Sequence, residues 1–403
     1  MPGNHSKDDR SFGYITILGM QHALAMFGST VLVPILTGLD ISVTLFAAGV
    51  GTLIFHMITK KKVPAYLGSS FAFIAPIGLV VEKMGIGSAQ GGIIVAGLVY
   101  ALMAIIIYLV GPGLIKSLFP PIVTGPVIMV IGLTLAPVAV DMASDNLLVA
   151  FIGLLAAAFV SVFGRGFFSV LPIMMGLLAG YFSAIVLGLV DFTEVLKAGW
   201  FGLPNFTAPV INWDAILMIA PVAIVSIVEH VGDVLAISAT IGKGKELMED
   251  PGIHRTMLGD GIATSIAGLF GGPPNTTYSE NIGVLAITGV YDSLVTRIAA
   301  VFAILLSLVP KVNMLINTIP RPVIGGISIL LFGMIASVGV RTMIENEVDL
   351  SRSRDLIIVS IILVIGIGGV TIQIGNLEFA GMGLAGLAGL ILNKVLPERL
   401  GEE

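Results

Sequence analysis

The chain has 403 residues, of which 56% are hydrophobic and 11% are charged, and its formal net charge is −5. About a quarter of the residues in a soluble domain are charged, so this composition excludes an ordinary soluble protein and indicates a membrane protein. Cysteine is absent, which excludes disulfides, thiolate metal sites and covalent thiol chemistry.

Fourteen apolar stretches are candidate membrane spans, because a helix needs about 20 residues to cross the hydrocarbon core. The polar tail, residues 1–13, precedes the first span and lacks the pattern of a cleavable signal peptide. The candidates lie at residues 14–38, 41–59, 65–82, 88–110, 121–140, 146–164, 167–190, 215–239, 255–271, 273–288, 292–309, 322–342, 355–372 and 377–396.

The third and tenth candidates open on residues that disfavour helix. Residues 65–82 begin with Ala-Tyr-Leu-Gly-Ser-Ser, and residues 273–288 begin with Pro-Pro-Asn-Thr-Thr-Tyr-Ser-Glu-Asn, which predicts extended chain leading into a half-helix. Irregular backbone survives at membrane depth only where protein buries it or where it lines a cavity. Because the two segments are seven spans apart, we expect two inverted seven-span repeats with the binding site at the interrupted spans.

A second correspondence supports this repeat. The pattern Pro-x3-Gly-x6-Gly begins at Pro121 in the fifth span and recurs from Pro322 in the twelfth. Small residues let helices approach closely. We therefore expect sliding contacts at the four glycines of the pattern, which are Gly125, Gly132, Gly326 and Gly333.

The basic residues predict the orientation in the membrane. If the N-terminus is cytoplasmic, 16 of the 20 Lys and Arg residues fall on the cytoplasmic side. Only Lys83, Lys197, Lys311 and Arg321 fall outside. We therefore expect a multi-pass protein of the cytoplasmic membrane with both termini in the cytoplasm.

Four of the 25 acidic residues lie inside apolar or small-residue stretches, namely Glu229, Asp233, Asp260 and Glu280. An ionised side chain in hydrocarbon costs roughly 2.5–3.5 kcal/mol even on a lenient scale, so each should face a cavity or a partner, as at a substrate or proton site. Glu229 and Asp233 are four residues apart and share one helix face. Two acids so close in a low dielectric should not both ionise freely. A proton-coupled carrier needs such a carboxyl group, because the group must bind and release a proton during transport. The alternative for Asp233 is a solvated, structural position at the end of its span.

Glu280 follows the broken segment of the tenth span, near the start of a half-helix. The free N–H groups of a helix N-terminus are donors, and an ionised carboxylate is an acceptor. Together they suit a flat molecule with alternating N–H and C=O groups, such as a nucleobase. Ser69, Ser70 and Phe71 in the third span would supply further N–H groups. Phe71 or Tyr278 could stack on the ring, or could instead pack in the core or against lipid.

The remaining intramembrane polar residues are expected to support this site. We expect Asp260 to hydrogen-bond a neighbouring helix or to act on the substrate indirectly, and His22 to support Glu229 and Glu280 rather than to relay protons. The sequence has no phosphate-binding loop ending in Gly-Lys-Ser/Thr and no metal-ligand spacing among its histidines. We therefore expect no enzymatic activity, no metal and no cofactor, and an ion gradient rather than ATP as the energy source.

Several long stretches resemble the nucleobase–ascorbate transporter family, and within it the bacterial uracil permeases. The resemblance covers residues 14–396 and is carried by GMQHALAMFGSTVLVP (19–34), PAYLGSSFAFIAP (64–76), VEHVGD (228–233), DPGIHRTMLGDG (250–261) and GGPPNTTYSENIGVLAITG (271–289). It implies an all-α fold of 14 spans in two inverted repeats, with short strands in spans 3 and 10. Residues 14–110 and 215–309 would form a core domain, and residues 121–190 and 322–396 a gate domain.

The resemblance also implies residue roles. Glu229 and Glu280 would hold the base, backbone groups at Phe71 and Ser279 would complete its recognition, and Tyr278 would line the pocket. Asp233, His22, Asp260 and Ser29 would supply proton coupling or support these contacts. The implied partners are a nucleobase, protons and the lipid bilayer, with a homodimer formed through the gate domain and no nucleic acid.

Two departures from the uracil permease pattern leave the substrate open. Uracil permeases usually have Gly at the position of Ser279 and commonly His at that of Asp233. Asp at the latter position resembles purine-transporting members, which generally carry Gln where this chain has Glu280. Proton-coupled uptake of uracil is therefore the first expectation and xanthine or urate the second. An anion transporter of the same fold is the third, and a non-transporting scaffold is disfavoured by the four intramembrane acids.

Overall fold

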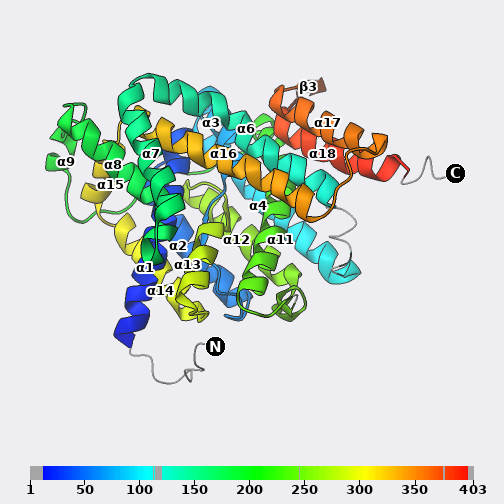
Figure 1. The fold of residues 1–403 in the computed structure, drawn as a ribbon, viewed down its shortest axis with the longest axis horizontal. Helices are drawn as coiled ribbons and strands as arrows, with labels where there is room; N and C mark the ends of the chain where they lie inside the picture. Colours follow the sequence, from blue (N-terminus) through cyan, green and yellow to red (C-terminus); the bar gives the residue numbers. More distant parts are fainter. Residues whose placement is uncertain (1–11, 112, 114–119, 245, 375–376, 398–403) are drawn as a thin grey trace.

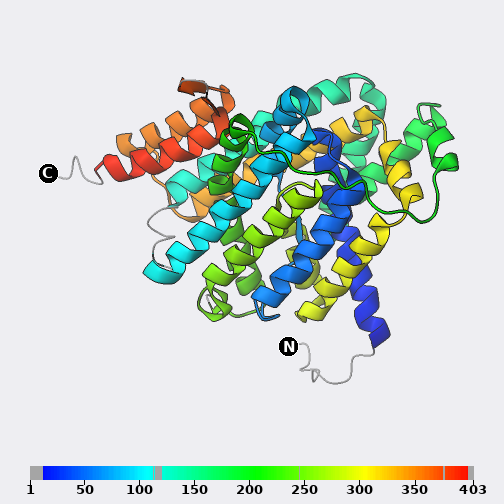
Figure 2. The same ribbon diagram turned by 180° about the vertical axis from the view of Figure 1, so that it is seen from behind.

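The computed structural model describes residues 12–111, 113, 120–244, 246–374 and 377–397. Side chains of residues 12, 279 and 371–380 lie outside the described part. The chain is largely α-helical, and its helices pack into one body (Figures 1 and 2).

The elements follow one another with short connectors. Those of the first half are α1 (Phe12–Thr37), α2 (Ile41–Ile58), β1 (Leu67–Ser69), η1 (Phe71–Phe73), α3 (Ile74–Met84), α4 (Ile86–Val110), α6 (Pro121–Ser144), α7 (Leu147–Phe163), η2 (Gly166–Val170), α8 (Pro172–Val186) and α9 (Thr193–Lys197). Those of the second half are α10 (Trp213–Ile219), η3 (Ala220–Val222), α11 (Ala223–Thr240), η4 (Met248–Gly252), α12 (Ile253–Phe270), β2 (Asn275–Thr277), α13 (Ser279–Thr288), α14 (Ser293–Ser307), α15 (Pro310–Asn317), α16 (Arg321–Glu345), α17 (Ser353–Ile367), β3 (Thr371–Ile374), β4 (Leu377–Ala380) and α18 (Gly381–Val395).

Polar residues in the short connectors start several of these helices. The carboxylate of Asp40 accepts a hydrogen bond of 3.0 Å from the backbone N–H of Val43 at the start of α2. Asn146, Asn212 and Asp292 cap α7, α10 and α14 in the same way. Such caps satisfy backbone donors that a helix leaves unpaired in its first turn. They mark the helix starts between the apolar stretches.

Each of the 14 predicted stretches contains a helix, but the predicted number of spans is not established by helix length. Among the described residues, six helices are long and apolar enough to cross a bilayer, or up to seven if α14 and α15, bent by 84°, form one broken span. The other helices are too short or not apolar enough, and α7, α8 and α18, for example, have 17, 15 and 15 residues.

The two interrupted segments form the predicted short strands, and these strands pair with each other. β1 and β2 run antiparallel, with Leu67 opposite Thr277 and Ser69 opposite Asn275. The pairing continues at one end, where the N–H of Tyr278 donates to the carbonyl of Tyr66 at 3.0 Å. Every residue of both strands is buried. The ladder thus satisfies backbone groups that would otherwise be exposed inside the membrane.

The helices pack in two groups. In the first, α12 packs on α4 and α2, while α14 packs on α2 and α1 around the strand pair. In the second, α16 packs on α6 and α7, α7 packs on α8, and α17 packs on α18. Figure 1 shows α6 and α16 lying alongside each other across the upper part of the molecule. The groups meet where α1 contacts α8, where α13 contacts η2, and where α11 contacts α6 and α18.

Three glycines of the repeated pattern lie at close helix contacts, but not between the two groups. A Cβ on Gly132 would approach the carbonyl oxygen of Phe332 in α16 to 2.3 Å, and one on Gly326 would approach that of Ala150 in α7 to 2.1 Å. Gly125 faces Met343 and Gly339 of α16. The prediction was wrong for Gly333, because nothing lies within 4 Å of a Cβ built there.

Two further features differ from the prediction. Residues 371–372 and 377–380 were expected inside the last two spans, but they belong to strands β3 and β4, which pair as an antiparallel hairpin. The connectors between the two helix groups contain the short helices α9 and α15, which contact each other. The N–H of Lys311 donates to the carbonyl of Gly199 at 3.1 Å, and the Lys311 ammonium lies 4.9 Å from the centre of the Trp200 ring.

Candidate substrate site

The strand pair brings the interrupted spans against α11. The N–H of Ser70 donates to the carbonyl of Pro274 at 2.9 Å, which extends the ladder to the start of η1. The hydroxyls of Ser70 and Ser226 of α11 lie 3.1 Å apart. Glu229 follows Ser226 by about one helical turn, so it lies beside the same crossing. The two interrupted segments, whose paired residues Leu67 and Thr277 are 210 residues apart in the sequence, therefore meet beside α11.

Glu229 has a carboxylate oxygen without a partner. Its Oε2 is buried and makes no hydrogen bond to any described residue. The acidic residues Asp233, Glu280 and Asp260 lie near this carboxylate. A buried acceptor without a donor is costly, typically about 1–3 kcal/mol. A ligand with an N–H group at this position would remove that cost.

Glu280 lies in the first turn of α13, directly after the strand β2. The hydroxyl of Ser29 of α1 donates to its Oε1 at 2.5 Å, which fixes the carboxylate between α1 and α13. Ser279 begins α13, and its side chain lies outside the described residues. The first backbone N–H groups of α13 have no partner within the helix, so Glu280 adds an acceptor beside possible donors.

The aromatic residues predicted at the site are both buried. Phe71 begins η1 and is 7% exposed. Tyr278 is 4% exposed, and its hydroxyl donates to the carbonyl of Ser69 at 3.0 Å. Its ring lies over Gly68, where a Cβ would approach the ring carbons to 2.4 Å. Tyr278 therefore holds the strand crossing as well as lying beside Glu280.

Asp260 has a buried partner to which the sequence assigned no role. The Nδ1 of His230 lies 2.7 Å from Oδ2 of Asp260, and both side chains are fully buried. The same Oδ2 accepts from the backbone N–H of Thr277 in β2 at 3.2 Å. The other ring nitrogen of His230 lies 2.9 Å from the hydroxyl of Thr256 in α12. His230 and Asp260 thereby attach the strand β2 to α11 and α12.

Asp233 reaches the same network from α11. The hydroxyl of Thr277 donates to its Oδ2 at 3.4 Å and lies 3.3 Å from Nδ1 of His230. Asp233 is 7% exposed, so it is buried rather than solvated at the helix end. His230 and Asp233 of α11 thus both contact Thr277 of β2.

His22 contacts the residue that follows Glu280. The amide nitrogen of Asn281, the residue after Glu280, donates to Nδ1 of His22 at 3.0 Å and to its carbonyl oxygen at 3.3 Å. His22 Nε2 and Asn281 Oδ1 are buried and have no hydrogen-bond partner in the described part of the chain. This pair connects α1 and α13, about two turns of α1 from the contact of Ser29 with Glu280.

Comparison with known proteins places this chain in a family of permeases. The family model Xan_ur_permease, described as the permease family, matches residues 13–375. The uracil permease of Bacillus caldolyticus is 47% identical over 409 residues, which cover 98% of this chain and 94% of that protein. The uracil permease of Escherichia coli K12 is 45% identical over 389 residues, covering 94% and 90%.

Solved structures show the same fold in more distant proteins. The transmembrane domain of the cyanobacterial bicarbonate transporter BicA superposes with a TM-score of 0.62 at 17% identity, covering 96% of this chain and 98% of that one. The murine anion transporter Slc26a9, in its inward-facing state, gives a TM-score of 0.71 at 10% identity and covers 98% and 69%. At these identities the likeness concerns the fold alone. By the family model and the permeases aligned over nearly its whole length, this multi-pass membrane protein belongs to the nucleobase–ascorbate transporter family.

Proposed function

We propose that this protein imports uracil across the cytoplasmic membrane together with protons, by alternating access. The observation that carries the proposal is the pair of carboxylates, Glu229 and Glu280, at the crossing of β1 and β2, with an unpartnered acceptor on Glu229. Relatives named uracil permeases align over nearly the whole chain and include this region.

The two carboxylates suit a base that has both ring N–H and carbonyl groups. Glu229 accepts from a ring N–H through its free Oε2, and Glu280, oriented by Ser29, accepts from a second N–H. Backbone N–H groups at Phe71 and Ser279 donate to the base carbonyls, because both residues begin helical segments directly after a strand. The buried rings of Phe71 and Tyr278 border the base.

Proton coupling follows from the charge balance of the site. Asp233 and Asp260 are buried near Glu229, while no Lys or Arg is buried among the described residues. Buried carboxylates need a counter-charge or a proton. His230 lies 2.7 Å from Asp260, so we assign the neutralisation of Glu229 during transport to a proton.

The finer architecture belongs to the same proposal. The chain has 14 spans in two inverted seven-span repeats, with both termini cytoplasmic. The first helix group is a core domain, residues 14–110 and 215–309, and the second is a gate domain, residues 121–190 and 322–396. The paired interrupted segments and the two packing groups support this division. Movement of one domain against the other exposes the site alternately to each side, and a homodimer forms through the gate domain.

Two alternatives are weaker. Xanthine or urate uptake is favoured by Asp233, the residue that resembles purine carriers of the family. Anion transport is favoured only by the fold that the chain shares with BicA and Slc26a9. An anion would have to approach four acidic side chains, and like charges repel strongly in a low dielectric.

Uptake of labelled uracil by cells that express the chain and lack their own uracil carrier tests the proposal. Unlabelled uracil, xanthine and urate are added as competitors, and labelled bicarbonate and sulfate are tested in parallel. The Glu229→Gln chain is the matched control. The proposal is supported if labelled uracil is taken up and unlabelled uracil is the strongest competitor. If xanthine competes more strongly than uracil, the purine alternative is supported instead. Uptake of an anion without uracil would contradict both.

A further inference from the structure

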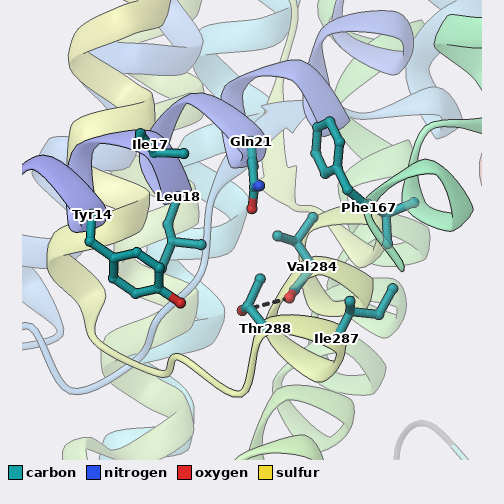
Figure 3. A pocket seen from close by; sticks show the side chains of 9 residues that line it. Tyr14, Ile17, Leu18, Gln21, Phe167, Val284, Ile287 and Thr288 are labelled. Atoms are coloured by element: carbon teal, nitrogen blue, oxygen red, sulfur yellow. Dashed lines mark hydrogen bonds between the residues drawn. The ribbon is translucent and has the colours of Figure 1, made fainter. Parts of the chain in front are cut away.

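A pocket of about 320 Å³ lies between α1, α13 and η2. Figure 3 shows side chains of α1 facing those of α13, with Phe167 of η2 closing one side. Leu18 and Val284 are 4% and 1% exposed and form its floor, whereas Tyr14 and Ile287, 45% and 47% exposed, form its rim. Pockets for small ligands start at about 300 Å³, so this one can hold a single-ring molecule.

The pocket is apolar apart from a few uncharged polar groups. Among the described residues, no Lys, Arg, Asp or Glu lines it. The hydroxyl of Thr288 already donates to the carbonyl of Val284 at 2.8 Å. The amide of Gln21 points into the space between α1 and α13 (Figure 3) and makes no side-chain hydrogen bond to a described residue. One amide offers both a donor and an acceptor.

The pocket lies in line with the candidate substrate site. Gln21 precedes Ser29 by eight residues and Val284 follows Glu280 by four, which places the pocket about 6–12 Å from the carboxylate along the two helix axes. Between them lie His22 and Asn281, whose Nε2 and Oδ1 are buried without partners. Two polar groups that can still form hydrogen bonds therefore lie between the candidate substrate site and the pocket.

The pocket also lies at the seam between the two helix groups. Gln21 and Val284 belong to helices of the first group, while Phe167 and Val170 belong to η2, which packs on α7 of the second. A movement of one group against the other changes the width of such a seam. The position near the start of α1 is the cytoplasmic side in the proposed orientation.

We propose that this pocket is a second, weak binding site for the transported base, occupied between the central site and the cytoplasm. The inference rests on the proposed function, and it assigns to this pocket a step in the release of the base to the cytoplasm. A neutral planar ring fits apolar walls, and its N–H and C=O groups can pair with the amide of Gln21. A lipid chain would fill the apolar space but would leave that amide unpaired. A site on a path must bind weakly enough to release its ligand, so we expect a Kd on the order of 1 mM.

The natural absence of cysteine allows a direct test. Ile287→Cys places the chain's one thiol at the rim of the pocket, and Glu229→Gln in the same chain weakens uracil binding at the central site. The rate at which a soluble thiol reagent labels the purified protein is measured with and without millimolar uracil. Ser351→Cys, exposed and outside the pocket, replaces Ile287→Cys in the control chain.

We expect uracil to slow labelling at position 287 but not at position 351, and Gln21→Leu to abolish this protection. Retained uracil binding by a chain that carries Gln21→Leu alone, with Glu229 intact, shows that the substitution leaves the fold and the central site unchanged. Three results would overturn the inference: equal labelling with and without uracil, protection that survives Gln21→Leu, or protection by short-chain lipid in place of uracil. Failure of the unmodified chain to import uracil would instead contradict the proposed function.

Discussion

At the scale of single residues, the site combines groups that are satisfied with groups that are not. Ser29 fixes one oxygen of Glu280 at 2.5 Å, and His230 fixes one oxygen of Asp260 at 2.7 Å. Glu229 Oε2 and Asp260 Oδ1, by contrast, are buried without hydrogen bonds to described residues. Fixed carboxylates set the geometry, and free oxygens leave capacity for a ligand or a proton.

The first prediction concerns the free oxygen of Glu229. In Glu229→Gln, one acceptor oxygen becomes an NH2 donor, which opposes the N–H of the base and costs about 1–3 kcal/mol. We expect uracil binding to the purified protein to fall at least about tenfold, which is 1.4 kcal/mol. Near-normal binding, measured by calorimetry, would remove Glu229 from the site.

The second prediction concerns Glu280 and its support. Glu280→Gln should weaken uracil uptake and improve xanthine uptake, because the resemblance to the family implies Gln at this position in its purine-transporting members. Ser29→Ala should weaken both, since it frees the carboxylate that the hydroxyl orients. Uptake of each labelled base is compared between the variants, and unchanged uptake of both bases by Glu280→Gln would show that the side chain does not contact the substrate.

The third prediction tests the buried pair of His230 and Asp260. Removing one partner leaves a buried group unpaired, which costs about 3–5 kcal/mol, whereas replacing both with apolar residues is often neutral. We expect His230→Leu and Asp260→Leu each to lower the thermal midpoint in detergent. The double variant should lose much less than the sum of the two. Additive losses would show that the pair does not act as a unit.

The sequence predicted the acids of the site but not their partners. Glu229, Asp233, Asp260 and Glu280 stand out because a charge in an apolar stretch needs an explanation. His230 gave no such signal, since a single histidine is compatible with many environments and its partner lies 30 residues further along the chain. The contact of Ser29 with Glu280 spans 251 residues, and no local pattern records it.

At the scale of elements, close helix contacts depend on particular glycines. Gly326 allows the backbone of α16 to touch that of α7, whereas Gly333, seven residues later on the same helix, faces open space. The two positions therefore form a matched pair. They separate the effect of a lost contact from the effect of a lost glycine.

The fourth prediction uses this pair. Gly326→Ala should overpack the contact with α7 and destabilise the protein by about 1–3 kcal/mol. Gly333→Ala should be neutral or stabilising, because Ala favours a helix by about 1 kcal/mol over Gly. Thermal unfolding and the yield of monodisperse protein are the measurements. Equal behaviour of the two variants would show that the contact between α16 and α7 is not formed.

The prediction of secondary structure was correct where the residue types clearly disfavour helix. Pro, Asn, Thr and Ser at the start of two spans disfavour helix, and those segments do form β1 and β2. The hairpin of β3 and β4 was missed, because its β-branched and apolar residues continue the apolar runs on either side. Periodicity alone does not separate a short buried strand from a buried helix.

At the scale of the whole molecule, the proposed mechanism requires two bodies and a driving ion. The helix groups meet along α1, α11 and α13, the helices that carry the site residues. The connectors between the groups are joined to each other through α9 and α15. A relative movement of the groups would therefore move both connectors together.

The fifth prediction concerns the driving ion. Uptake should collapse when an uncoupler removes the proton gradient, and it should decline as external pH rises, because the carboxyl groups are loaded with protons from outside. Replacing sodium by potassium should have no effect, since the acids of α11 lie on regular helix without an unwound carbonyl cage. Uptake that survives the uncoupler but requires sodium would contradict this coupling.

The sequence clearly indicated a membrane protein, because the high apolar content of the whole chain suits a lipid environment rather than water. The number of spans is harder to predict, since several helices are shorter than a span and their crossing depends on neighbours rather than on length. The grouping of helices follows from contacts between distant segments. In a single sequence such contacts appear only as weak repeats, such as the glycine pattern that Gly333 leaves incomplete.

The pairing of β1 with β2 also constrains how the protein can be made. Leu67 emerges from the ribosome 210 residues before its partner Thr277, so the first interrupted segment enters the membrane with its backbone groups unpaired. Those groups need water or a temporary partner, since hydrocarbon satisfies none of them. Only when the second interrupted segment arrives can the ladder close and the site form around it. A nascent chain that stops before β2 is thus left with an open strand edge, which is a template for pairing with another chain.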